Sequence, residues 1–348
     1  MDQSMNRFIP TVHHPEQPGP GGAAGRSGKS KLKSNLLPSL GAGGGSPGIF
    51  ECSFPLPAIS EPARMLSRIF RHKPFADPSP TLANVPYGRD CGRQKLDFWA
   101  GSPDSGSPVP ALIFFHGGGF VRGSKFFCKQ MHEVRERGGV AISVNYRFLR
   151  KPGSTIARSM DDSRRVLDFV RERAGEWNID PNRIALHGKS SGGCIALWLA
   201  MKENLRGVTT HNTPTSLDPE LLVEIGKRRI EAFLPIWGPM SGTWRSSELN
   251  SPRVRKLVED YSPLHQAHPA SPPLYLHYTS DQPLGRIGWL HALHSVRYGE
   301  LMKERYDQLG LSCELASPSR PPGRPPLEFL CEVLGLPAEP IAAVMEQN

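Results

Sequence analysis

Three short runs of apolar residues lack the alternation that a half-exposed strand shows. They are Ala111–Phe115, Val140–Val144 and Ile184–Leu186. Between the last two, the segment Ser159–Trp177 carries its apolar residues at helical spacing. Continuous apolar strands that alternate with helices are typical of a parallel sheet covered on both faces. The sequence therefore predicts an α/β fold, with a mostly parallel, twisted sheet and helices on both faces.

Further elements continue this alternation toward the C-terminus. The segments "EAFLPIWG" (231–238) and "PPLYLHYTSD" (272–281) each hold an apolar run of strand length. A helix is expected through Val296–Leu309, and a last short strand around Cys313–Leu315. No internal repeat is present in the sequence.

The N-terminal part has a different composition. Residues 1–48 are rich in Gly, Pro, Ser and Lys, and we expect a disordered basic leader because such a segment buries little apolar surface. Residues 49–94 are interpreted as a lead-in, in which "EPARMLSRIFRHK" forms a short helix packed on the domain, a lid or a membrane-surface anchor. The α/β domain is assigned to 95–348. Residues 1–95 carry +6 of the net charge of +9, and no nucleic-acid-binding motif accompanies them.

The six cysteines are scattered and form no C-x-x-C pair. This spacing argues against a zinc site and against a disulfide-rich secreted module. Reduced thiols, and with them a cytoplasmic location, fit best. The sequence shows neither a bilayer-length apolar run nor a secretory signal, and it implies no metal or organic cofactor.

The segment "RIALHGKSSGGCIAL" combines a strand, a sharp turn and a helix. Its letters G-K-S do not make a P-loop, because Arg183 stands where the first glycine of that motif is required. Its G-x-S-x-G, from Gly188 to Gly192, places Ser190 between an apolar strand and an apolar helix. Glycines at both ends permit the strained turn and close helix approach of a nucleophile elbow. The helix N-terminus also favours negative charge beside the serine.

A second glycine-rich motif precedes the first by 74 residues. His116-Gly117-Gly118-Gly119 follows the apolar run that ends at Phe115. Glycines at such a position let backbone N–H groups point into a site. One of them, together with the N–H of Ser191, would hold the oxyanion of a tetrahedral intermediate.

These two motifs carry a family resemblance. The chain resembles α/β-hydrolases of the hormone-sensitive-lipase-like group of carboxylesterases and acetyl esterases, through "HGGG", then Asn145-Tyr146-Arg147, then "GKSSGG". The segment Ala83–Trp99 is similar to the lead-in strands of acetyl-xylan- and feruloyl-esterase-like members. The resemblance covers roughly residues 80–315. It implies Ser190 as nucleophile, Gly117 and Gly118 in the oxyanion hole, and structural roles for His116, Gly119, Gly188 and Gly192.

The sequence departs from the group beside the nucleophile and at the acid. Lys189 replaces the usual acidic residue; it is either a cation that favours an anionic substrate or the oxyanion, or a solvated lysine at the pocket rim. Asp281, just past the strand at Leu274–His277, is the expected acid. Matching Pro283-Leu284 to the group's D-P-L instead puts Gln282 in that place.

The catalytic histidine is absent from its usual place. The group carries it in the loop after the final strand, whereas no histidine follows His294 here. Only His291 and His294 continue the order Ser, Asp, His along the chain, and both fall near the start of the helix after the Asp281 loop. We expect His294 to be the base, with His291 as the second choice; the alternative is that both are ordinary surface histidines.

The sequence thus predicts a serine carboxylesterase that cleaves short-chain, acetyl-like esters of a small molecule, which includes acylated carbohydrates. The alternative is a catalytically impaired relative that binds a ligand or a partner protein, since a serine without a base is a poor nucleophile. Recruitment to nucleic acid through the basic leader is a much weaker hypothesis. Oligomeric state is not encoded in these motifs.

Overall fold

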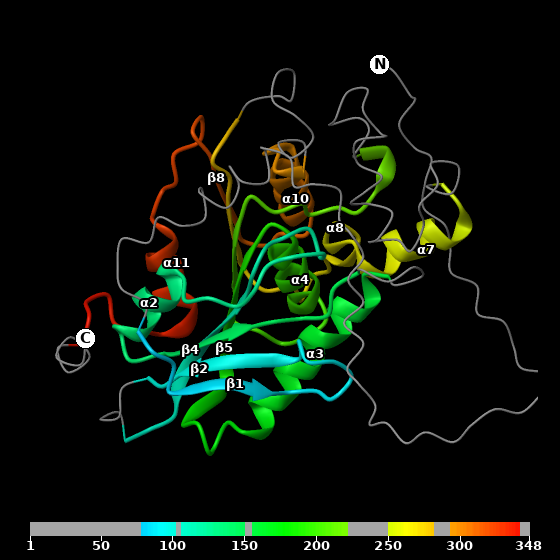
Figure 1. Ribbon diagram of the computed structural model, residues 1–348. Helices are drawn as coiled ribbons and strands as arrows, with labels where there is room; N and C mark the ends of the chain where they lie inside the picture. The colour runs from blue at the N-terminus through cyan, green and yellow to red at the C-terminus, as the bar shows by residue number, and fades with distance from the viewer. Residues whose placement is uncertain (1–77, 102–105, 150–154, 222–249, 282–292, 342–348) are drawn as a thin grey trace, which may run out of the picture. The chain divides into compact units, whose positions relative to one another are not determined.

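The central element of the protein is a twisted sheet (Figure 1). The computed structural model describes residues 78–101, 106–149, 155–221, 250–281 and 293–341. All of them belong to one compact unit, Ile69–Asn348; the other unit, Met1–Arg68, lies outside the described residues. Within the described residues the sheet has eight strands. These are β1 Leu82–Pro86, β2 Lys95–Trp99, β3 Val109–Phe115, β4 Val140–Val144, β5 Ile179–Lys189, β6 Val208–His211, β7 Leu274–His277 and β8 Cys313–Ala316.

The order of the strands places the carboxyl ends of segments that are far apart in the sequence at one edge of the sheet. The order is β1-β2-β4-β3-β5-β6-β7-β8. Strands β1 and β2 pair antiparallel, as do β2 and β4, and every pair from β4 to β8 is parallel. The carboxyl ends of β3 to β8 therefore meet at the same edge, where open α/β sheets build their sites.

Helices cover both faces of the sheet. In the described residues they are α2 Lys129–Arg135, α3 Ala157–Glu172, α4 Ser191–Ala200, α7 Pro252–Tyr261, α8 Pro263–Gln266, α10 Arg297–Gln308 and α11 Pro326–Leu334. Side chains of α3, α4 and α10 join one apolar cluster with one face of the sheet. Helices α2 and α11 lie on the other face (Figure 1), and their side chains join a second apolar cluster with it. All residues of β3 and β4 are buried, which explains their uninterrupted apolar sequence.

Most predicted elements are present, with one strand that the sequence did not reveal. The predicted runs lie in β3, β4, β5, β7 and β8, and the predicted helices are α3, α4 and α10. The place between β5 and β7 is taken by β6, whose sequence is only "VTTH". The segments 231–238 and "EPARMLSRIFRHK" lie outside the described residues. The mostly parallel sheet with helices on both faces agrees with the α/β fold expected from the sequence.

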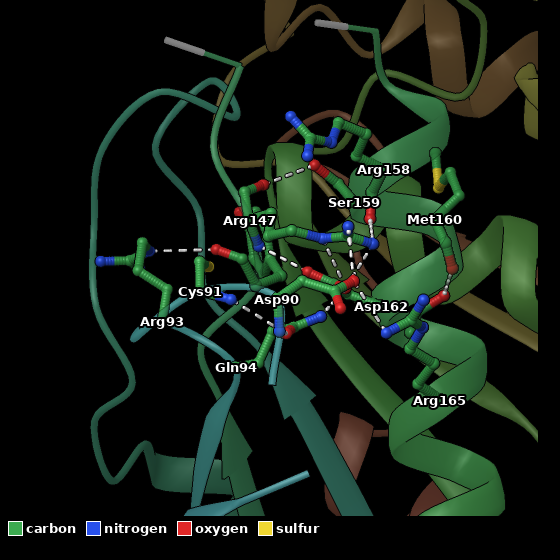
Figure 2. A network of polar contacts seen from close by, with 12 residues as sticks. Asp90, Cys91, Arg93, Gln94, Arg147, Arg158, Ser159, Met160, Asp162 and Arg165 are labelled. Atoms are coloured by element: carbon green, nitrogen blue, oxygen red, sulfur yellow. Dashed lines mark hydrogen bonds and ion pairs between the residues drawn. The ribbon is translucent and has the colours of Figure 1, made fainter. Parts of the chain in front are cut away.

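The lead-in joins the domain through a buried polar network (Figure 2). Asp162 of α3 is fully buried and accepts hydrogen bonds from Gln94 Nε2 (2.8 Å), the Arg147 backbone N–H (2.7 Å) and Arg147 Nε (2.8 Å). Asp90 accepts hydrogen bonds from Arg147 Nη1 (3.1 Å) and Arg165 Nη1 (2.9 Å). A buried carboxylate that is bonded in this way fixes its partners firmly. The network therefore holds residues 90–94 against α3 and the end of β4.

Candidate active site

Ser190 stands at a strained turn between β5 and α4. Its φ of 50° and ψ of −120° are unusual for a residue with a side chain. The turn is held because the Ser190 N–H donates to the His211 carbonyl at 2.9 Å. A Cβ on Gly188 would lie 2.4 Å from the Gly192 carbonyl oxygen, and one on Gly192 would lie 2.1 Å from the Phe115 oxygen. Both glycines are thus required for close backbone approach, as in a nucleophile elbow.

The His294 imidazole lies beside this serine. The Ser190 Oγ and the His294 Nε2 are 2.9 Å apart, a hydrogen-bond distance. His294 precedes α10 by three residues, at the edge of the sheet where β5 to β8 end. The structure therefore brings together the serine and the histidine that the sequence pairs across 104 positions. The second choice, His291, lies outside the described residues.

The His116–Gly119 loop lies against the elbow. Gly118 and Gly119 have φ of 133° and 63°, and a Cβ on Gly118 would lie 2.0 Å from the Arg122 oxygen. A Cβ on Gly117 would lie 3.3 Å from the Ser190 Cβ. Only glycines fit a loop that combines such φ values with this close approach.

Tyr146 ties the loop to the start of α4. Its hydroxyl donates to the His116 carbonyl at 2.7 Å and lies 3.3 Å from the Ser191 Oγ. Burial raises the pKa of Tyr146 far above neutrality, so its proton stays in place. The His116 ring stacks on Tyr146 with centroids 4.6 Å apart. Ser191, the first residue of α4, thereby keeps a fixed relation to the glycine loop.

His116 is a neutral, buried part of this arrangement. Its Nδ1 is 2.7 Å from the Gly117 carbonyl and, since a carbonyl only accepts, Nδ1 carries the proton. Burial lowers the pKa of His116 to about 4, and the nearby Arg93 guanidinium adds to that effect, against an opposing hydrogen bond to Gly117. The imidazole therefore holds the loop without carrying charge at neutral pH.

Arg93 is a residue of this site that the sequence reasoning missed. Its Nε donates to the Tyr146 carbonyl (3.0 Å), and its Nη2 donates to the Gly123 carbonyl (3.1 Å) and to Asn145 Oδ1 (3.2 Å). The same Nη2 is 3.4 Å from His116 Nε2. Its guanidinium carbon lies 3.6 Å from the centroid of the Phe148 ring. The lead-in therefore supplies a cation that clamps both ends of the glycine loop; no motif marks it, because its partners come from other segments.

Asp281 lies past the end of β7 and meets the loop after β8. Its Oδ2 accepts the backbone N–H of Ser319. Its Oδ1 is buried and has no hydrogen-bond partner among the described residues. Desolvation acts to raise the pKa of Asp281, but hydrogen bonds from Ser317 and Ser319 and the charge of Arg320 outweigh it and leave the pKa lowered. The carboxylate is thus ionised, and no described contact joins it to His294.

Three nitrogen-bearing side chains continue the site along the edge of the sheet. Lys189 is paired in register with His211, and His211 with His277, at the ends of β5, β6 and β7. The Lys189 Nζ lies 5.5 Å from the centroid of the Phe126 ring. The His211 and His277 Nδ1 atoms are 3.0 Å apart. His211 was not predicted because β6 was not recognised, and His277 was recognised only as the end of a predicted strand. The described residues contain no cluster of three or more His, Cys, Asp or Glu side chains that would hold a metal ion.

Residues 96–283 match the protein family described as BD-FAE. The chain belongs to this family. The match covers the elbow, the glycine loop and Asp281, and it ends before His294. The predicted resemblance to hormone-sensitive-lipase-like carboxylesterases is confirmed.

Individual relatives support the same placement. The chain is 34% identical over 123 residues to a probable isoprenylcysteine alpha-carbonyl methylesterase of Oryza sativa subsp. japonica, covering 35% of this chain and 29% of that protein. It is 24% identical over 225 residues to the esterase LipQ of Mycobacterium tuberculosis, covering 58% of this chain and 49% of the relative. The chain thus spans at most about half the length of these two relatives.

Solved structures confirm the predicted α/β-hydrolase fold. A thermophilic esterase of Thermogutta terrifontis aligns with a TM-score of 0.54 and 22% identity, covering 75% of this chain and 95% of the other. In the described part of this chain, no helix is both long and apolar enough to cross a bilayer.

Proposed function

We propose that the protein is a serine carboxylic ester hydrolase, with Ser190 as nucleophile and His294 as general base. The observation that carries the proposal is the 2.9 Å separation of Ser190 Oγ and His294 Nε2 at a strained strand-to-helix turn. A hydroxyl is a weak nucleophile unless a positioned base accepts its proton. The expected loop after β8 carries no histidine, and His294, from the segment before α10, supplies the imidazole instead.

The proposed reaction follows from the positions of these groups. Ser190 Oγ attacks the ester carbonyl carbon while its proton passes to His294 Nε2. The backbone N–H groups of Gly117, Gly118 and Ser191 hold the oxyanion. His294 then gives the proton to the leaving alkoxide, which departs as the alcohol. Water attacks the acyl-enzyme with His294 again as base, and this releases the acid and restores Ser190.

Asp281 remains the proposed acid that orients His294. Its support is its place after β7, its ionised state and a buried Oδ1 without a partner among the described residues. Asp281→Asn tests this role, because the loss of the orienting carboxylate in a serine triad lowers kcat by about 10⁴-fold. A fall of less than tenfold would instead make Asp281 an anchor of the loop at Ser319.

The proposed substrates are small esters with short, acetyl-like acyl groups, and acylated carbohydrates are included. Support for this class comes from the resemblance of the motifs and the lead-in to acetyl-esterase-like members of the group. The rival proposal, a binding protein with little turnover, keeps the fold but requires that Ser190 be unactivated. Nothing in the proposed reaction calls for a cofactor.

Labelling with a fluorophosphonate separates the two proposals, because it reports an activated serine whatever the natural substrate. We expect labelling of the full-length protein and hydrolysis of p-nitrophenyl acetate or butyrate. Ser190→Ala should abolish both, and His294→Ala should lower kcat by several orders of magnitude. His265→Ala, which removes an exposed imidazole from α8, is the matched control and should change neither. An unlabelled, folded wild-type protein would favour the binding protein.

A further inference from the structure

A row of nitrogen-bearing side chains extends from the elbow across the end of the sheet. Lys189, His211 and His277 occupy matched register positions on three neighbouring parallel strands. Because side chains alternate along a strand, they project to the same face as Ala185 and Tyr275, which belong to the apolar cluster beneath α2 and α11. All three are only partly buried. The row starts one residue from the proposed nucleophile.

Lys189 is the cation at the start of the row. No ion pair involves it within the described residues, and its contact there is with the Phe126 ring. Lys125 on the same side of the sheet contrasts with it, because its Nζ lies 2.7 Å from the Asp97 carboxylate. An ammonium that is partly withdrawn from water and has no carboxylate beside it attracts an anion from solution.

The protons of the two histidines follow from Asn212. The Asn212 Oδ1 accepts the backbone N–H of Thr279 at 2.9 Å, so its Nδ2 is the atom that lies 3.4 Å from His211 Nε2. An amide nitrogen only donates, and His211 Nε2 therefore accepts. The His211 proton is then on Nδ1 and is donated to His277 Nδ1 at 3.0 Å. His277 in turn carries its proton on Nε2, which makes no hydrogen bond within the described residues.

The row is therefore electropositive, but its two histidines are neutral and add no charge to that of Lys189. Burial first, and then the charge of Lys189, lower the pKa of His211 to about 3, with smaller effects from His277 and His294. Burial also lowers the pKa of His277. The row thus has one cation, the Lys189 ammonium. The His277 Nε2 lies on the side of its ring opposite Nδ1, and so points away from His211 and from Lys189.

We propose that Lys189 binds a carboxylate on the substrate, separate from the ester that is cleaved, so that the enzyme prefers anionic esters. The proposal rests on the proposed function and names its substrate class. A carboxylate accepts a charge-assisted hydrogen bond from an ammonium, and the neutral histidines beside Lys189 add no second charge. Dicarboxylic acid monoesters and acylated hydroxy acids belong to this class. The second carboxylate takes no part in the bond changes at Ser190.

The test compares esters that differ only in this charge. Monomethyl adipate and the methyl ester of adipic acid monoamide differ on the acyl side. The 4-acetoxybenzoate anion and 4-acetoxybenzamide differ on the alcohol side. Released acid is followed by pH-stat titration at about pH 7.5, where carboxylates are ionised. The measured quantity is the ratio of kcat/KM for the anionic member to that for the neutral member of each pair.

We expect a ratio above one in at least one pair. Lys189→Met should lower that ratio roughly tenfold, the effect of losing one partly screened ion pair. Lys189→Arg should restore most of it, and His277→Asn should leave it near the wild-type value, because the His277 Nε2–H points away from Lys189. Lys256→Met is the matched control, since it removes a fully exposed lysine of α7 and the same net charge. Its ratio should equal that of the wild type, and added salt should lower the wild-type ratio.

A ratio that Lys189→Met leaves unchanged in both pairs would overturn the proposal, even if every ester is cleaved. If no ester is cleaved, the proposed function has failed. The proposed carboxylate site can then still be tested by measuring ligand binding. Titration calorimetry with Ser190→Ala should then give tighter binding of monomethyl adipate than of its amide analogue. That difference should be lost in the Ser190→Ala, Lys189→Met double variant. Equal binding of the two ligands to Ser190→Ala would refute the subsite.

Discussion

Removal of the Arg93 guanidinium should lower kcat, although it changes neither Ser190 nor His294. The change Arg93→Met keeps the aliphatic stem and deletes the donors to Tyr146, Gly123 and Asn145. Gly123 lies just after the glycine loop, and Asn145 and Tyr146 directly follow β4. The loop would lose the contacts that fix its distance from the elbow.

The size of the effect follows from the environment of each bond. The bonds to the Tyr146 carbonyl and Asn145 Oδ1 are partly buried, whereas the one to the Gly123 carbonyl is exposed, so water replaces it. A hydrogen bond to a charged group contributes about 1.5–3 kcal/mol, so two of them predict a loss of about 3 kcal/mol in the free energy of unfolding. A displacement of about 1 Å in the loop would lower kcat by about 10²-fold.

The assay combines urea unfolding with kcat and KM for p-nitrophenyl butyrate. We expect kcat to fall about 10²-fold with KM changed far less, because the loop acts on the oxyanion of the transition state. Arg93→Lys should be intermediate, since one ammonium cannot reach all of these acceptors.

The matched control is a second arginine, in β5, the strand that ends at the elbow. Arg183 of β5 donates to the Leu334 carbonyl through Nε (3.0 Å) and Nη2 (2.6 Å) and to the Gly335 carbonyl (2.8 Å). Arg183→Met should lower stability by a similar amount and leave kcat near the wild-type value. A folded Arg93→Met protein whose kcat is within threefold of wild type would refute the reasoning, as would an equal loss of kcat in Arg183→Met.

Three further predictions concern pH, packing and the leader. The pKa of His116 is lowered to about 4 and that of His211 to about 3, both below the unfolded value. The unfolded chain therefore binds more protons than the folded protein below about pH 6.5. Each buried histidine should lower the free energy of unfolding by up to about 1.4 kcal/mol per pH unit on acidification. Urea unfolding at pH values from 7.5 to 5 measures this, and a free energy of unfolding that does not change with pH would contradict it. Gly192→Ala, whose Cβ would lie 2.4 Å from the His116 oxygen, should lower Tm and kcat, whereas Gly175→Ala, with open space around it, should not lower kcat. Deletion of residues 1–48 should leave Tm and esterase activity about unchanged, and a large loss of either would make the leader part of the fold.

The sequence by itself determined the elements whose information is local. Apolar runs such as Ala111–Phe115 predict buried strands because a central strand has no solvent-facing side. The glycines at 188 and 192 predict the elbow because a sharp turn under a close helix leaves no room for a Cβ. The order of Ser190, Asp281 and His294 along the chain made His294 the first choice for the base, and the structure places its Nε2 2.9 Å from the Ser190 Oγ.

Only the tertiary structure decided which distant residues support these elements. Strand β6 reads "VTTH", a short and partly polar segment that pairs only because β5 and β7 lie on either side of it. The register of that strand is what aligns Lys189 with His211 and His277. Arg93, just before β2, reaches across β4 to the segment that follows β3, and Asp281 reaches Ser319 from a neighbouring strand end. These contacts depend on strand order and register, which the long-range packing of the whole sheet sets and no local stretch of sequence encodes.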